Sequence, residues 1–170
     1  MRKAWAVTLS FCALLGTPAF SQGVASHVLG FEIQVEPVFV VKTDSSTSGG
    51  LSIGPLYPGK GSAVETVEVM ISTNQGSPYK IFHQLGQPLA SDTGFTFPLN
   101  RFQFTVSDGK KGGRSLVRDY ERVTPHKTVI FSSNHEGDED RFTISYRVDS
   151  QRVIPAGNYS TQLMITGAPQ

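Results

Sequence analysis

The stretch Arg141-Phe142-Thr143-Ile144-Ser145-Tyr146-Arg147-Val148-Asp149 shows most directly how this chain folds. Its apolar residues stand at every second position, with polar or charged residues between them. Because successive side chains of a β-strand point to opposite faces, this alternation predicts a strand with one buried face and one solvated face. The stretch 159–166 alternates in the same way and predicts a second strand.

Further strands are expected around these two, wherever Val, Ile, Phe, Tyr and Thr are concentrated. Turn residues such as Gly, Pro, Asn and Asp separate the segments, and no long helical pattern lies between them. The sequence therefore predicts an all-β fold of two packed antiparallel sheets, an immunoglobulin-like sandwich, with a jelly roll as the alternative. The additional strands are expected at 29–41, 64–72, 79–85, 101–106 and 128–132.

The amino terminus has the three-part pattern of a secretory signal peptide. Arg2 and Lys3 precede an apolar stretch at 4–15, which is followed by a Gly/Pro break and small residues, so we expect cleavage after Ser21. The apolar stretch is shorter than the roughly 20 residues that span a bilayer, so no membrane span is expected after cleavage. Residues 22–170 are then expected to form a single exported domain, located in the periplasm, at the cell surface or outside the cell.

Charge and cysteine content exclude several kinds of partner and chemistry. Without Arg2 and Lys3, 13 of the 15 basic residues remain beside 14 acidic ones, so the exported part has no strong field to attract nucleic acid. Cys12 is the only cysteine and lies within the expected signal peptide, so the domain has neither a disulfide nor a thiol nucleophile.

No motif of a known catalytic site stands out. The stretch 54–61 comes close to a phosphate-binding loop but lacks the Ser or Thr that would bind magnesium, and it contains two prolines. Gly50-Leu51-Ser52-Ile53-Gly54 matches the letters of G-x-S-x-G, but no helical pattern follows it, as a nucleophile elbow would require. The four histidines have no shared metal-binding spacing and are expected at the surface or in turns; they are His27, His83, His126 and His135. We therefore expect neither catalysis nor a cofactor, and keep a hydrolase with a dispersed site as a remote alternative.

Two groups of residues are candidates for ligand binding. The acidic run that begins at His135 concentrates oxygen ligands on one loop and is a weak calcium candidate, with His135, Glu136, Asp138 and Asp140 as the ligands. A solvated hairpin is the simpler interpretation of this run. Aromatic rings stack on sugars, and Tyr57, Tyr79 and Tyr120 lie in or beside turns where they could do so, although core packing is the simpler interpretation for each.

Two stretches resemble subunits of bacterial surface fibres. The segment Ile154-Pro155-Ala156-Gly157-Asn158-Tyr159-Ser160-Thr161-Gln162-Leu163-Met164-Ile165-Thr166 resembles the closing strand of spore coat U-type and related chaperone–usher pilin domains. The segment 29–36, in which Leu29, Phe31, Ile33 and Val35 alternate with polar residues or glycine, resembles the start of such pilins. The exported part lacks the disulfide that spore coat U-type pilins usually carry.

The resemblance implies assembly by β-strand addition, in which an amino-terminal segment fills a groove in a neighbouring subunit. Only four residues follow Thr166, so we expect one sheet edge to be left open or to be covered by the segment 22–35. Leu29, Phe31, Ile33 and Val35 are the expected assembly strand, and self-pairing of 29–41 within its own sandwich is the simpler alternative. The expected function is a non-catalytic structural or adhesive protein that associates with itself or with a periplasmic chaperone; the alternative is a carbohydrate-binding module.

Overall fold

The computed structural model describes residues 32–44, 51–57, 59, 61–150 and 154–170. The chain divides into two units, Met1–Gln34 and Val35–Gln170, and all the strands described below belong to the second unit. No described residue lies in a helix long and apolar enough to cross a membrane.

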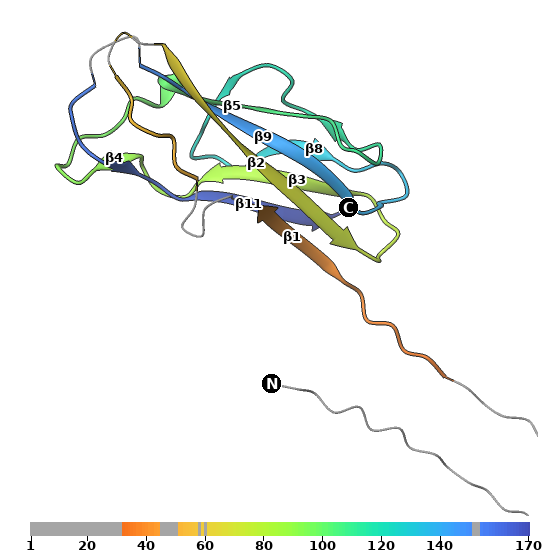
Figure 1. Ribbon diagram of the computed structural model, residues 1–170. Helices are drawn as coiled ribbons and strands as arrows, with labels where there is room; N and C mark the ends of the chain where they lie inside the picture. Colours follow the sequence, from red (N-terminus) through yellow and green to blue (C-terminus); the bar gives the residue numbers. More distant parts are fainter. Residues whose placement is uncertain (1–31, 45–50, 58, 60, 151–153) are drawn as a thin grey trace, which may run out of the picture. The chain divides into compact units, whose positions relative to one another are not determined.

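Antiparallel strands form two main sheets, as the sequence predicted (Figure 1). The larger sheet has the order β1-β2-β9-β5-β7, and the smaller has the order β11-β3-β8-β6. A short two-stranded ladder joins β10 to β4. The strands of the larger sheet are β1 (Phe39–Asp44), β2 (Ser62–Thr73), β9 (Asp140–Asp149), β5 (Phe102–Val106) and β7 (Glu121–Arg122). The others are β11 (Leu163–Pro169), β3 (Tyr79–Leu85), β8 (Thr128–Ser132), β6 (Arg114–Ser115), β10 (Tyr159–Ser160) and β4 (Ala90–Ser91).

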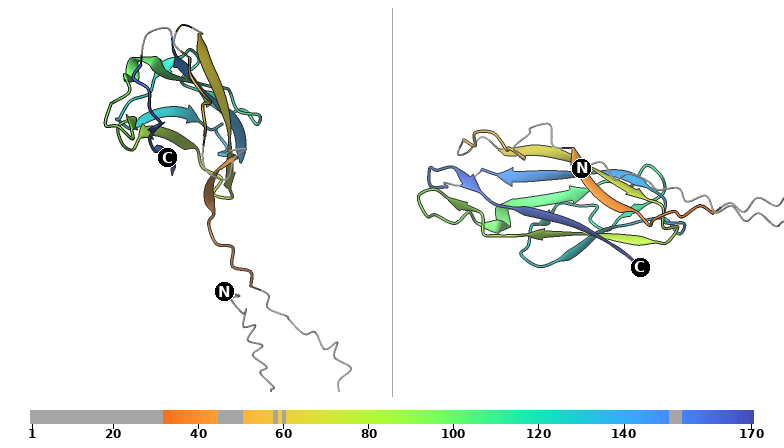
Figure 2. Two further views of the ribbon diagram at one scale, coloured as in Figure 1. Left: turned by 60° about the vertical axis from the view of Figure 1, so that its left-hand side comes forward. Right: turned by 90° about the horizontal axis from the view of Figure 1, so that it is seen from below.

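The order of the strands agrees with an immunoglobulin-like sandwich. In constant-type domains one sheet contains strands A, B, E and D, and the other contains C, F and G. Here β1, β2, β9 and β5 take the order A-B-E-D, while β3 and β11 take the places of C and F. Within the described residues, no strand pairs with the outer edge of β11, where strand G would lie. Figure 2 shows the two layers from two further directions.

The core lies between the two sheets and is built from the alternating residues that predicted the strands. Phe142, Ile144, Tyr146 and Val148 of β9 are all buried, whereas the residues between them are half-buried. Aromatic rings join the layers, since Phe131 of the smaller sheet stacks on Phe142 with ring centroids 4.2 Å apart. No buried side-chain nitrogen or oxygen among the described residues lacks a hydrogen-bond partner, as a stable interior requires.

The first strand begins later than the sequence suggested. We expected a strand at 29–41, but β1 begins at Phe39, and residues 32–38 belong to no strand and are exposed. Pro37 has no backbone N–H to donate to a ladder. The side chain of Asn74 takes over the neighbouring backbone groups: its Oδ1 accepts from Val38 N at 2.6 Å, and its Nδ2 donates to Glu36 O at 2.9 Å. Leu29 lies outside the described residues.

Candidate assembly edge

The outer edge of β11 is the most distinctive surface of the described sandwich. β11 pairs with β3 along one side, from Leu163 opposite Leu85 to Pro169 opposite Tyr79. Its sequence, LMITGAP, contains no charged residue. Leu163 and Ile165 are partly buried against the core, whereas Met164 is 47 % exposed. The edge therefore presents backbone hydrogen-bonding groups beside an apolar interior.

The other edge strands of the two main sheets carry charge. β1 contains Lys42 and Asp44, β7 consists of Glu121 and Arg122, and β6 contains Arg114. Charged side chains and short length are the usual means by which proteins prevent a sheet edge from pairing with another chain. Among the edge strands described here, β11 alone has seven residues and no charge.

β1 lies against one end of β11, near Gly167 (Figure 1). The ring of Phe39 meets the ring of Tyr79 edge-on, with centroids 5.3 Å apart. The same ring lies so close to Gly167 that a Cβ there would overlap its Cε1 and Cζ atoms, and the Cβ would also lie 3.0 Å from Val41 Cγ2. Glycine at 167 is therefore what allows β1 to approach the end of β11.

Two of the four expected assembly residues can be placed. Ile33 and Val35 are 70 % and 73 % exposed, the most exposed of the large hydrophobic side chains described. Leu29 and Phe31 lie outside the described residues. The residues from Glu32 to Val38 are all exposed, so their apolar side chains are not used in the core of this sandwich.

The three tyrosines that were candidates for ligand binding have different surroundings. Tyr79 is 0 % exposed and its hydroxyl donates to Asp138 O at 3.0 Å, so it packs in the core, as the simpler interpretation had it, and offers no stacking face. Burial raises the pKa of Tyr79, and the nearby carboxylate of Asp140 adds to this effect. Tyr120 is half-buried, and the guanidinium of Arg147 covers one face of its ring at 3.8 Å. Tyr57 is 57 % exposed.

The buried or hydrogen-bonded carboxylates of the calcium candidate bind groups of the protein itself. Asp140 is buried; its Oδ1 accepts from Lys111 N at 2.9 Å and Arg141 N at 2.7 Å, and its Oδ2 accepts from Gly113 N at 2.9 Å. Asp138 Oδ2 accepts from Asn134 Nδ2 at 2.8 Å, while His135 and Glu136 are exposed. The described residues contain no group of three or more His, Cys, Asp or Glu side chains that could hold a metal ion. The carboxylates of Asp138 and Asp140 therefore hold the loops around them in place by hydrogen bonds.

His83 is the main polar residue that the sequence interpretation misplaced. We expected it at the surface or in a turn, but it is 1 % exposed and lies within the core. Its ring stacks on Phe104 with centroids 4.6 Å apart, and its Nε2 is 3.0 Å from the hydroxyl of Tyr146. Burial lowers the pKa of His83 to about 4 and raises that of Tyr146. The alternation of β3 was the missed signal, because His83 shares a face with the buried Ile81 and Leu85.

No family model and no curated protein matches the chain. One solved structure that resembles it is a family 123 glycoside hydrolase from Clostridium perfringens. The two chains share 11 % sequence identity with a TM-score of 0.40, and the match covers 66 % of this chain and 19 % of the hydrolase. This chain thus corresponds to about a fifth of the length of that protein.

Proposed function

We propose that the protein is an exported, non-catalytic structural subunit that assembles by β-strand addition. Residues 29–35 of one copy would pair with the outer edge of β11 of the next. The observation that carries the proposal is the contrast between the edges: β1, β6 and β7 are charged, whereas the seven residues of β11 are not. An uncharged edge beside partly buried apolar residues is the kind of surface to which an extended peptide adds.

The exposed segment before β1 has the pattern that such an edge would accept. Ile33 and Val35 are two residues apart and so project on the same side of an extended chain. The sequence places Leu29 and Phe31 in the same alternation. Burying each of these side chains in a neighbour would contribute roughly 1.5–3 kcal/mol, in addition to main-chain hydrogen bonds along the edge.

The non-catalytic part of the proposal has its own support. Among the described residues, those with strongly shifted pKa values are Tyr79, His83 and Tyr146, and each is buried and hydrogen-bonded within this same chain. Strongly shifted pKa values often mark catalytic groups, but buried structural networks also produce them. Here the second explanation fits, because these side chains fill the interior between the sheets.

The decisive experiment places a charge on the edge without touching the core. Thr166 is exposed on β11, and Thr166→Lys should prevent assembly while leaving the melting temperature close to that of the unaltered protein. Thr43→Lys on the already charged β1 is the matched control and should assemble normally. Assembly is followed by light scattering after size-exclusion chromatography. Polymers of unchanged length in the Thr166→Lys variant would refute the proposal.

A peptide experiment tests the donor segment when assembly itself requires a chaperone. A synthetic peptide of residues 22–38 should raise the melting temperature of a protein that lacks residues 1–34, because a ligand of the native state stabilises it. The same peptide with Ile33→Asp and Val35→Asp should have no effect. Equal stabilisation by both peptides, or by neither, would contradict the role given to these two side chains.

A further inference from the structure

An irregular break interrupts the two-stranded ribbon formed by β3 and β11. The β11–β3 ladder has Leu163 opposite Leu85, and pairing resumes with Ser160 of β10 opposite Ala90 of β4. Between these pairs, residues 161–162 on one strand face residues 86–89 on the other. Unequal lengths of this kind make a bulge, and bulges often lie beside binding sites because they redirect side chains.

The bulge is held in place by hydrogen bonds across it. Gly86 N donates to Gln162 O at 2.7 Å, and Thr161 Oγ1 donates to Gln87 O at 2.5 Å. Leu89, in the longer strand, is buried in the core. Beyond the bulge, the ring of Tyr159 packs edge-on against Phe97 with centroids 5.5 Å apart. The two strands are therefore fixed relative to each other on both sides of the break.

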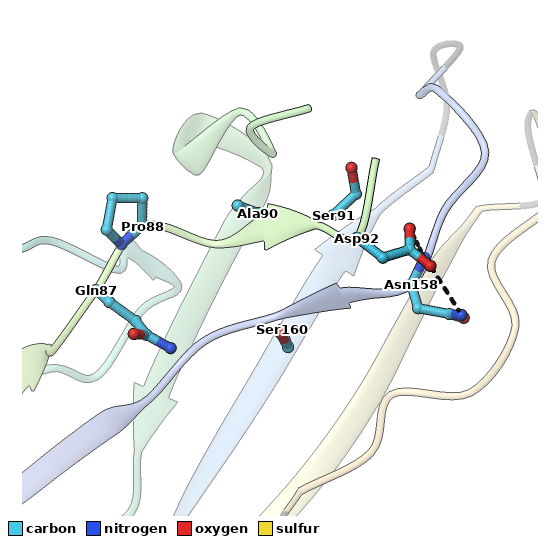
Figure 3. Close-up of a pocket in the computed structure, with 7 residues that line it drawn as sticks. All are labelled: Gln87, Pro88, Ala90, Ser91, Asp92, Asn158 and Ser160. Atoms are coloured by element: carbon cyan, nitrogen blue, oxygen red, sulfur yellow. Dashed lines mark hydrogen bonds between the residues drawn. The ribbon is translucent and has the colours of Figure 1, made fainter. Parts of the chain in front are cut away.

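A surface depression of about 650 Å³ lies at this break (Figure 3). Gln87 and Asp92 line it from one strand, and Asn158 and Ser160 line it from the other. Its volume lies within the roughly 300–1,000 Å³ typical of small-molecule sites. The side chains that line it are mostly polar, and Asp92 is the only charged one.

The polar groups of the depression have unused hydrogen-bonding capacity. The carboxylate of Asp92 accepts from Asn158 N and Asn158 Nδ2, both at 3.4 Å, which is long for a hydrogen bond (Figure 3). An ionised carboxylate has about four acceptor positions, so stronger donors can still bind to it. Within the described part of the chain, the Gln87 amide and the Ser160 hydroxyl have no hydrogen-bond partner, and the Asn158 Oδ1 accepts no hydrogen bond.

The turn that carries Asp92 is closed and presents an aromatic ring. Ser91 Oγ accepts from Phe95 N at 2.9 Å, and Ser91 N donates to Phe95 O at 2.8 Å. Phe95 is 52 % exposed. The opposite loop is packed tightly against this turn, since a Cβ at Gly157 would lie 3.0 Å from Ser91 Cβ and 3.2 Å from Asp92 Oδ1. The polar groups of the depression are therefore held in fixed positions before a ligand binds.

The geometry points to a neutral saccharide as the ligand of this depression. Sugar hydroxyls both donate and accept hydrogen bonds, which matches a carboxylate beside amide and hydroxyl groups. The single charge of Asp92 disfavours phosphate, sulfate and acidic sugars. This site is separate from the tyrosines that the sequence suggested, and it does not depend on strand addition.

The inference is tested by nuclear magnetic resonance on the full-length exported chain. Methyl glycosides of glucose, galactose, mannose and N-acetylglucosamine are titrated singly to about 50 mM, a range suited to weak binding at an open site. At least one sugar should shift the amide signals of residues 86–95 and 157–162 in a saturable manner. Absence of saturable shifts with all four sugars, or shifts confined to other residues, overturns the inference. Equal binding of glucuronate also overturns it, because Asp92 should repel an acid.

Variants then assign the binding to these side chains. Asn158→Ala and Gln87→Ala should each weaken the bound sugar about fivefold, the expected effect of losing one hydrogen bond. Asp92→Asn should weaken sugar binding and remove the discrimination against glucuronate. Asn100→Ala and Asp119→Asn change exposed polar residues elsewhere and should bind like the unaltered protein. Unchanged affinity in all three depression variants refutes the site, and the Thr166→Lys variant should bind sugar normally even where assembly is lost.

Discussion

At the scale of single residues, His83 shows how a polar side chain can be part of an apolar core. Its imidazole stacks on Phe104 and meets the Tyr146 hydroxyl, so two aromatic neighbours and one hydrogen bond replace the water it has lost. Burying a polar group is tolerable only when it is hydrogen-bonded, and charging it there is much less favourable. The neutral form of His83 is therefore the one compatible with the folded state.

This arrangement predicts a loss of stability in acid. The pKa of His83 is about 4 in the folded protein, against 6.5 for the unperturbed side chain, so the unfolded state takes up the proton first as the pH falls. The free energy of unfolding should therefore be highest above pH 6.5 and should decrease by up to about 3 kcal/mol as the pH falls towards 4. Urea unfolding at a series of pH values measures this.

The control for the pH effect is a second histidine. His83→Gln should flatten the pH dependence between 4 and 6.5, even if it lowers stability at neutral pH. His126→Gln, at an exposed position, should keep the full dependence. A variant without His83 that loses stability with the same pH profile as the unaltered protein would show that another group is responsible.

Asp140 gives a second prediction at this scale. Its two carboxylate oxygens accept from three backbone amides, including those of Lys111 and Gly113. In Asp140→Asn, one of these oxygens becomes an NH₂ group that faces a donor, so stability should fall by about 1–3 kcal/mol in urea unfolding. Glu136→Gln, an exposed change of the same chemistry on the same loop, should alter stability little. Equal effects of the two substitutions would exclude the amide contacts as the cause.

At the scale of elements, the contact between β1 and β11 is governed by Gly167. Gly167→Ala introduces a methyl group that overlaps the Phe39 ring and approaches Val41, so β1 must move away. We expect a loss of about 1–3 kcal/mol, the usual effect of overpacking, and faster hydrogen exchange of the amides in β1.

Two further variants make this prediction specific. Gly54→Ala places its methyl group in open space and should leave stability nearly unchanged. Adding Phe39→Leu to Gly167→Ala should restore part of the lost stability, because the smaller side chain gives the methyl group room. If Phe39→Leu and Gly167→Ala are simply additive, the two residues do not interact in the way described.

The sequence predicted strands well where β-forming residues stand between turns, and poorly where side-chain hydrogen bonds replace strand pairing. The strand 79–85 matches β3 and the strand 128–132 matches β8; the first alternates with period two, and the second is a short run of β-forming residues. The first strand was placed too early, because Asn74 binds the backbone beside Pro37 from 36 residues away in the chain. The expected strand 159–166 is split into β10 and the start of β11 by a bulge that depends on the partner strand.

The candidate sites were harder to predict than the fold. Tyr79 packs in the core, as its simpler interpretation had it, whereas the burial of His83 was missed although both residues share the alternation of β3. The depression beside Asp92 and Asn158 could not be predicted, because it arises from pairing between segments 66 residues apart. The absence of charge from the edge of β11 was visible in the sequence, but its significance depends on knowing which strands lie at the edges.

At the scale of the whole molecule, the division of the chain gives a direct prediction. All the strands described lie in Val35–Gln170, so a protein lacking residues 1–34 should fold with a melting temperature within about 2 °C of that of residues 22–170. The same protein should fail to polymerise under the proposed function. Circular dichroism and light scattering measure the two properties. A truncated protein that does not fold would show that the first unit contributes to the sandwich.

The uncharged edge of β11, unpaired among the described residues, determines the symmetry of an assembly in which subunits join as proposed. The donor segment and the acceptor edge are different surfaces of the same chain, so each contact is heterologous, and copies that neither exchange segments reciprocally nor close into a ring form an open row. A row built in this way has polarity: one terminal copy keeps an unfilled edge and the other keeps an unused segment. Growth at the two ends would then proceed by different reactions, and a single capping molecule could block only one of them.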